Sequence, residues 1–432
     1  MIEALGLNPG WVVVALIVVL LVAGMPIAFV LGIAAAIVIL LEPGVSNLII
    51  GVVPFDGANN YLLSAALLFM IAGEAMNRGD IARKLIDFAS ALVGHLRGGL
   101  AHCNILTSLF FSEISGSATA DAAAIGSVMI PQMKRRGFPV AFAAAVTTTS
   151  ATMAIIIPPS LNLILYAFVA EVSIAQLFAA GILPGIVVFA LLILTAYLLA
   201  LRGGHPIEHS FAWSRVARTG KDALLPLVIP LLILGGILGG VVTATEAGAL
   251  AALTALTIAA FVYRTLGLGD VVAVLRTAAT RAAMLLYIVA TSTLLGWYLT
   301  TEQIPQELAS AIGAVSEDPA VVLLLINLFF LLAGTVIHGT PAILMLVPIF
   351  LPLATEIGID PVHFGLIVTL NLGIGQQTPP VASVLLITCS IARIGIAEVI
   401  PPLMVFIMAM LVALALINAF PFLSLWLPSV LV

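Results

Sequence analysis

The stretch FSEISGSATADAAAIG, residues 111–126, places polar groups within an apolar region of the chain. Within nine residues it holds Glu113, Ser115, Ser117, Thr119 and Asp121. The apolar runs on either side, residues 100–114 and 118–130, are shorter than the roughly 20 residues that a membrane-spanning helix needs. Because Ser115-Gly116-Ser117 is a run of small residues that can turn tightly, the stretch predicts a helical hairpin whose tip leaves backbone groups free.

The composition around this stretch indicates an integral membrane protein. Of the 432 residues, 62% are hydrophobic and only 8% are charged, too few to cover a soluble globule. Apolar runs longer than about 18 residues recur, whereas the alternating pattern of an outer-membrane barrel does not, so the fold class is all-α. Cys103 and Cys389 lie in apolar stretches and indicate neither a disulfide framework nor a metal site.

The hydropathy pattern predicts nine crossing helices, near residues 11–41, 61–77, 138–170, 177–201, 224–241, 246–263, 282–299, 362–391 and 397–420. The first is expected to be one long helix, bent at Gly24-Met25-Pro26, and not a signal peptide. Residues 100–133 and 319–353 are expected to form hairpins that enter and leave the membrane on one side. Two amphipathic stretches, 81–96 and 302–315, are expected to lie in the interface.

The basic residues agree with this layout. With a cytoplasmic N-terminus and a periplasmic C-terminus, all 15 Lys and Arg residues fall on the inner side, and none lies at membrane depth. Turning either hairpin into a full crossing would scatter these residues over both faces. The sequence therefore predicts a multi-pass protein of the inner membrane.

Two parts of the chain share a pattern. Pro131 precedes Pro158-Pro159 by 27 residues, and Pro352 precedes Pro379-Pro380 by the same interval. Because an odd number of predicted crossings separates the copies, the second is inverted, as in secondary transporters. The predicted units are an N-terminal scaffold helix and linker, a first repeat, connecting scaffold helices and a second repeat, at residues 1–60, 61–201, 202–281 and 282–432.

The repeats interrupt their helices at matched places. The second hairpin tip is His338-Gly339-Thr340-Pro341, and each tandem proline pair frees carbonyls in the preceding turn. Oxygen ligands of this kind suit Na⁺, a hard cation. A proline pair alone can be a simple kink, but two pairs at matched positions favour interruption.

Asp121 is a candidate functional residue, because an acid at membrane depth costs about 2.5 to 3.5 kcal/mol unless it is paired or wetted. The alternative is that it caps the second arm of the hairpin. Glu113 is expected to face an aqueous cavity, in a structural or a functional role.

At these residues the sequence resembles the large membrane subunit of tripartite ATP-independent periplasmic (TRAP) transporters, the DctM-like family. The resemblance is carried by Met25-Pro26-Ile27-Ala28, Ala72-Gly73-Glu74-Ala75-Met76-Asn77-Arg78, the opening stretch, Ile156-Ile157-Pro158-Pro159-Ser160, Ala180-Gly181-Ile182-Leu183-Pro184-Gly185, Glu302-Gln303-Ile304-Pro305 and Thr378-Pro379-Pro380. The resemblance implies that the protein is not an enzyme. It implies instead an elevator-type importer in the bacterial inner membrane that is driven by a Na⁺ gradient. Such an importer takes an organic anion, such as a C4-dicarboxylate or sialic acid, from a periplasmic binding protein and works with a small four-helix membrane subunit.

The resemblance also implies site residues, and it implies no organic cofactor. The first Na⁺ site is expected at Ser115, Ser117, Thr149 and Pro158, with Asp121 nearby. The second is expected at His338, Gly373, Gly375 and Thr378. The substrate is expected at Ser115, Gly116, Thr148, Asn162, Gly339, Thr340, Asn371 and Gln377.

The second tip departs from the family pattern. Where the family usually reads Met-Asp-x-Thr-Pro, this chain reads Ile337-His338-Gly339-Thr340-Pro341. A neutral imidazole supplies no anionic oxygen, so the second cation site is expected to be weakened, moved or replaced by proton coupling.

Three rival functions are weighed against this one. The first is a stand-alone ion-coupled carrier of another inverted-hairpin family. The second is an intramembrane protease, on the short match Gly267-Leu268-Gly269-Asp270, but this match falls in a basic loop where a solvated turn is expected. An ion channel is disfavoured because no filter-like carbonyl ring or ring of charges is evident.

Overall fold

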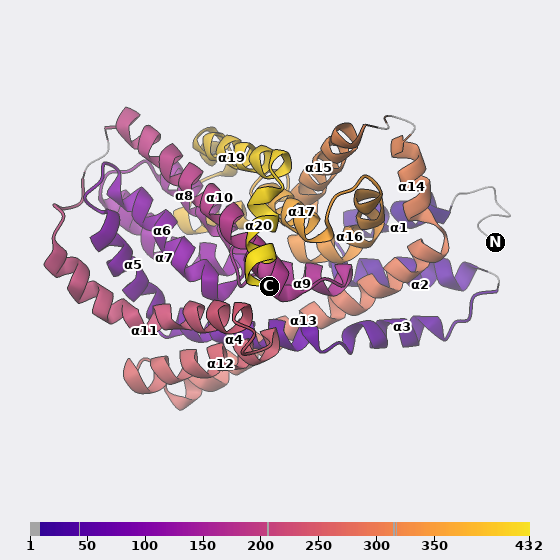
Figure 1. Ribbon diagram of the computed structural model, residues 1–432, viewed down its shortest axis with the longest axis horizontal. Coiled ribbons are helices and arrows are strands. Elements are labelled where there is room, and N and C mark those ends of the chain that lie inside the picture. Colours follow the sequence, from indigo (N-terminus) through magenta and orange to yellow (C-terminus); the bar gives the residue numbers. More distant parts are fainter. Residues whose placement is uncertain (1–8, 43, 205–206, 314–315, 317) are drawn as a thin grey trace.

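The computed structural model describes residues 9–42, 44–204, 207–313, 316 and 318–432 (Figure 1). Within these ranges every regular element is a helix, which confirms the all-α prediction. Seven of the described helices are long and apolar enough to cross a membrane. They are α10 (Ile174–Arg202), α11 (Trp213–Leu238), α12 with its π-helical end (Ala244–Val262), α13 (Leu268–Thr301), α15 (Pro319–Val336), α16 (Gly339–Glu356) and α19 (Ile396–Ala419).

The prediction of one long first helix is wrong. The chain forms α1 (Pro9–Val22) and α2 (Ile27–Leu41), which pack against each other. They separate because Gly24 has a φ of +81° and Pro26, which has no N–H to donate, precedes the second helix. The hydropathy pattern also missed α3 (Ile49–Ala58), which packs on α13.

The helices α4 (Leu62–Arg78), α5 (Ile81–Val93), α11, α12 and α13 pack on one another and carry no proline-pair break. Figure 1 shows α11, α4, α12, α13 and α3 along one side of the molecule, with the hairpins and broken helices on the other. We call α3, α4, α11, α12 and α13 the scaffold side.

Two of these helices begin earlier than predicted. α11 starts at Trp213 and α13 starts at Leu268, whereas the predicted helices start near residues 224 and 282. The expected solvated turn at residues 267–270 is therefore a helix start, where the Gly267 N–H donates to Asp270 Oδ2 at 3.0 Å. One consequence is that Arg281 lies inside α13 and not in a loop before it.

The same order of elements occurs twice. First come α5, α6 (Gly99–Ser115) and α7 (Ala118–Arg135), then α8 (Val140–Ala151), the 3₁₀ turn Thr152–Ile155, α9 (Leu161–Ala170) and α10. In the second copy α14 (Ile304–Gly313), α15 and α16 precede α17 (Pro361–Gly375), α18 (Ser383–Ala392) and α19, and α20 (Phe422–Leu431) follows. The Pro158–Pro159 and Pro379–Pro380 bonds are both cis. The arms of the second hairpin are long enough to cross by themselves, so its return to one side of the membrane stays a prediction.

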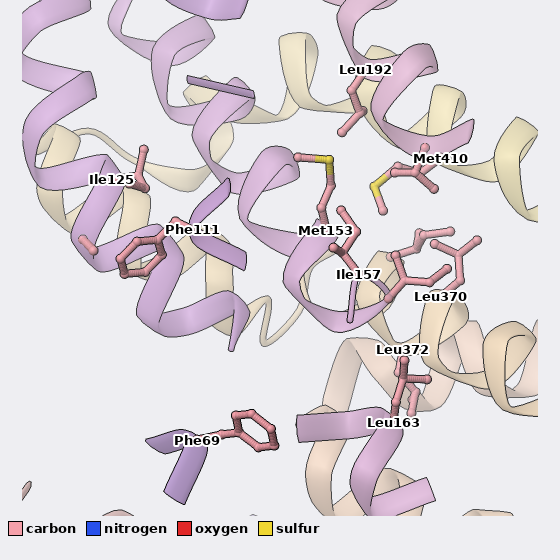
Figure 2. Packing of buried hydrophobic residues seen from close by; sticks show 14 of the residues in the cluster. Phe69, Phe111, Ile125, Met153, Ile157, Leu163, Leu192, Leu370, Leu372 and Met410 are labelled. Carbon is pink, nitrogen blue, oxygen red and sulfur yellow. The ribbon is translucent and has the colours of Figure 1, made fainter. Parts of the chain in front are cut away.

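The two copies interlock. α7 packs against α8 and against α18 of the other copy, while α16 packs against α17 and against α9. The Thr148 and Thr388 hydroxyls meet at 2.6 Å where α8 crosses α18. Figure 2 shows Met153 and Ile157 of the first copy close to Leu370 and Met410 of the second. Burial of these side chains joins both breaks in one core.

Candidate functional site

The first hairpin tip lies on the break in the first broken helix. α6 ends at Ser115, Gly116 adopts a φ of +56°, and the Ser117 hydroxyl accepts the Ala120 N–H at 3.4 Å to cap α7. The Gly116 carbonyl accepts the N–H of Leu161, the first residue of α9, at 3.3 Å. A Cβ on Gly116 would lie only 2.8 Å from the Pro159 carbonyl oxygen. Only glycine fits this approach.

The second tip reaches the same short segment from another direction. A Cβ on Gly339 would lie 2.6 Å from Gln376 Nε2 and 3.0 Å from Asn162 Nδ2. Since Leu161 bonds to the first tip and Asn162 contacts the second, the first turn of α9 lies between the two tips. Sequence reasoning named both tips and Asn162, but it did not predict that the first turn of α9 joins the tips.

His338 and Thr340 flank this second contact. His338 is the residue before α16 and is exposed, and Thr340 lies in the first turn of that helix and is half-buried. The structure therefore brings Gly116, Asn162 and Gly339 together and places His338 beside them.

The second break is held by close backbone contact. A Cβ on Gly375 would lie 2.5 Å from Gly334 Cα, and the Val381 N–H donates to the Thr335 carbonyl at 3.0 Å. Gly373 faces Thr152 and Ile155 across the core, so the two breaks are adjacent.

Two side chains at this break have clear roles. The Thr378 hydroxyl donates to the Ile374 carbonyl at 2.8 Å, and Gln377 Nε2 donates to the Met410 sulfur at 2.8 Å. The Gln377 Oε1 atom is a buried hydrogen-bond acceptor with no partner among the described residues.

Asp121 is fully buried in α7, where its side chain meets Ser108 of α6. Its Oδ1 accepts the Ser108 hydroxyl at 3.2 Å, whereas its Oδ2 has no partner within the described ranges. Ser117 caps α7, so the alternative that Asp121 caps this helix is wrong. A chain of buried polar contacts continues from Ser108 through Ser150 and Asn104 to Thr147, with distances of 3.2, 3.2 and 2.6 Å.

Three predicted side chains make contacts within or between helices. Thr148 bonds to Thr388 and to the Ala144 carbonyl, and the Thr149 hydroxyl donates to the Ala145 carbonyl. Asn371 Nδ2 donates to Asn327 Oδ1 at 2.8 Å, and Asn327 in turn bonds Asn418 of α19. These interactions occupy their donor groups away from the tips. The Asn371 Oδ1 atom is buried without a described partner.

A cavity of about 320 Å³ opens between the first tip and the scaffold side. Its polar lining joins Ser115, Ser117 and Thr119 of the hairpin to Glu74, Asn77 and Arg281 of α4 and α13. Of these, only Ser115 and Ser117 were predicted as site residues. The Glu74 carboxylate accepts Arg78 Nε at 2.8 Å and Arg281 Nη1 at 3.0 Å. Arg281 belongs to this lining because α13 begins at Leu268, 14 residues before the predicted helix start at residue 282. The signal that could have revealed this lining is Glu74, an acid within the apolar helix α4 that was not predicted as a site residue.

A second cavity, of about 830 Å³, lies between α9, α13 and α16. Leu161, at the start of α9, lines the smaller cavity, whereas Ala167 and Glu171, at its end, line the larger one. The two cavities therefore lie at opposite ends of the helix that joins the tips.

Comparison with known proteins gives a consistent family. Residues 14–423 match the family model of the tripartite ATP-independent periplasmic transporter, DctM component. The chain is 38% identical to the C4-dicarboxylate TRAP transporter large permease protein DctM of Pseudomonas aeruginosa, over 92% of this chain and 93% of that protein. It is 35% identical to the sialic acid TRAP transporter large permease protein SiaM of Vibrio cholerae, over 95% of this chain and 96% of that protein.

Among solved structures, the YdaH transporter of Alcanivorax borkumensis matches with a TM-score of 0.64 and 15% identity, covering 96% of this chain and 98% of that one. MtrF of Neisseria gonorrhoeae matches with a TM-score of 0.60 and 13% identity, covering 91% and 95%. At such low identity these two matches establish a shared fold and nothing more.

Proposed function

This chain belongs to the DctM family of large membrane subunits of TRAP transporters, and on that premise we propose that it imports an organic anion by a Na⁺-driven elevator movement. As a family member it is a multi-pass component of a secondary transporter and not an enzyme. Membership also implies a small membrane subunit and a periplasmic binding protein as partners. The four-helix form of the small subunit and the import direction belong to the proposal.

The observation that supports the proposal best is the convergence of both tips on the first turn of α9. Helix ends and proline breaks expose N–H and C=O groups there, which suit an anion and a cation side by side. The hairpins and broken helices form the moving unit, and the scaffold side stays in place. Cavities at both ends of α9 suit alternating access to this region.

The described residues fit Na⁺ as a co-transported ion. Asp121 Oδ2 and Gln377 Oε1 are buried oxygens without described partners, and a hard cation is bound by oxygen ligands of these types. Gln377 lies at the second break, and Asp121 in the first copy bonds Ser108, which also bonds Ser150 just before the first break. Na⁺ beside Asp121 would offset the free-energy cost of burying its carboxylate. Na⁺ at either place would also favour binding of an anion nearby.

Uptake by the complete assembly is the direct test. The chain is reconstituted in proteoliposomes with an imposed Na⁺ gradient and offered succinate, N-acetylneuraminate and isethionate, each with and without the matching binding protein and small subunit. We expect Na⁺-dependent accumulation of one of these acids only when both partners are present. Accumulation by the chain alone would favour the stand-alone carrier instead. No Na⁺ dependence would contradict the coupling.

His338 is expected to lower the number of coupled Na⁺ ions or to make uptake depend on pH. The family pattern that this sequence resembles has an aspartate at this position of the second tip. The neutral imidazole of His338 offers no anionic oxygen in its place. In His338→Asp we expect a higher Na⁺ Hill coefficient and a flatter profile between pH 5.5 and 8. The measurement is initial uptake against Na⁺ concentration at each pH. Identical coefficients and profiles in both proteins would remove this idea.

A further inference from the structure

One buried acid on the scaffold side is shared by two cations. The Glu74 side chain is 5% exposed, whereas those of Arg78 and Arg281 are 40% and 51% exposed. Both guanidinium groups donate to the same carboxylate, so the cluster keeps one uncompensated positive charge. Because Glu74 uses Nη1 of Arg281, the other N–H donors of this planar group stay available.

The cluster faces the first hairpin tip across a small cavity. A Cβ on Gly73 would lie 3.2 Å from Ser115 Cα, so α4 and the tip are in close contact beside Glu74. Arg281 lines the same cavity of about 320 Å³ as the hydroxyls of Ser115, Ser117 and Thr119. That volume suits one small organic acid.

We propose that Arg281 binds one anionic group, a carboxylate or sulfonate, of the transported acid while the tip hydroxyls bind the rest of the molecule. A guanidinium group holds such oxygens through two parallel N–H···O bonds, and the cavity supplies no other described cation. This inference rests on the proposed function and deepens it, because it gives the scaffold side a direct contact with the substrate. Glu74 is then a positioning residue that orients Arg281.

The first test measures the charge in the cavity without any substrate. Ala123 lines the cavity and is exposed, so Ala123→Cys is a reporter that spares the proposed ligands. The native Cys103 and Cys389 are buried, and the parent protein serves as the blank. The rates of modification by an anionic and a cationic methanethiosulfonate are compared. We expect Arg281→Gln to lower the anionic-to-cationic rate ratio by about tenfold, the effect of a unit charge across roughly 10 Å.

Three companion variants sharpen this result. Glu74→Gln leaves two unpaired guanidinium groups and is expected to raise the ratio, and Arg281→Lys is expected to preserve it. Arg276→Gln, in the same helix but outside the cavity, is the matched control and should leave it unchanged. An unchanged ratio in Arg281→Gln overturns the proposal, because the charge would then not reach the cavity.

The second test is the KM for uptake of whichever acid the wild-type assembly transports. Loss of a charge-assisted contact in Arg281→Gln is expected to raise KM about 10- to 100-fold, with partial rescue in Arg281→Lys and no change in Arg276→Gln. A lower rate ratio with an unchanged KM also overturns the proposal, since the charge would not bind substrate. If the wild type transports none of the acids, the proposed function fails, while the rate ratio still decides whether the cavity attracts anions.

Discussion

Gly116→Ala is expected to abolish Na⁺-driven uptake and to lower the unfolding temperature by several degrees. The residue has a φ of +56°, which costs an L-residue with a side chain roughly 1 to 2 kcal/mol. The added methyl group would also lie 2.8 Å from the Pro159 carbonyl oxygen and 3.1 Å from the Leu161 nitrogen. Both neighbours are backbone atoms at the break and cannot rotate away. The tip must therefore lift from α9, and the convergence on which the proposed transport depends is lost.

Gly137→Ala is the control for the cost of placing alanine at a positive φ. Gly137 has a φ of +83°, but a Cβ there would meet no atom within 4 Å. This variant should lose similar stability from the strained φ and keep its uptake. Thermal unfolding of purified protein and uptake in proteoliposomes are measured on the same preparations. Normal transport by Gly116→Ala would show that the contact between the tip and the break is not needed.

Asp121→Asn is expected to reduce uptake at least 100-fold while the protein unfolds at the same or a higher temperature. Asparagine keeps the size of the side chain and an oxygen for the Ser108 hydroxyl, and it removes a buried carboxyl group that has one unpartnered oxygen. Removing such a group relieves a desolvation cost, so stability should not fall. A loss of function with preserved stability is the pattern of a residue kept for ion binding.

Asp318→Ala supplies the contrasting case. Asp318 caps α15 by accepting the Ala320 N–H at 2.9 Å, and removal of such a cap typically costs about 1 kcal/mol. We expect reduced stability and normal uptake. If Asp121→Asn behaved like Asp318→Ala, with lower stability and full uptake at saturating Na⁺, the role of Asp121 would be structural.

Much of the arrangement followed from local sequence features. Low charge and recurrent apolar runs predicted the helical membrane class, and Ser115-Gly116-Ser117 and the two proline pairs predicted the tip and the breaks. These features act within one or two helical turns, so a single sequence reveals them. The hydropathy pattern did not predict where helices start. α13 begins at Leu268, where Asp270 accepts the Gly267 N–H, and this polar start leaves no mark in the hydropathy pattern.

The sequence by itself therefore determined the class of protein, the matched order of its hairpins and broken helices, and the family to which it belongs. Only the tertiary structure decided that the first turn of α9 joins the two tips, that Thr148 and Asn371 hold helices together, and that Arg281 faces the first tip. The physical reason is the distance along the chain over which each interaction acts. Hydropathy and backbone conformation are properties of neighbouring residues, whereas the partners of a polar side chain depend on how helices distant in sequence pack against one another.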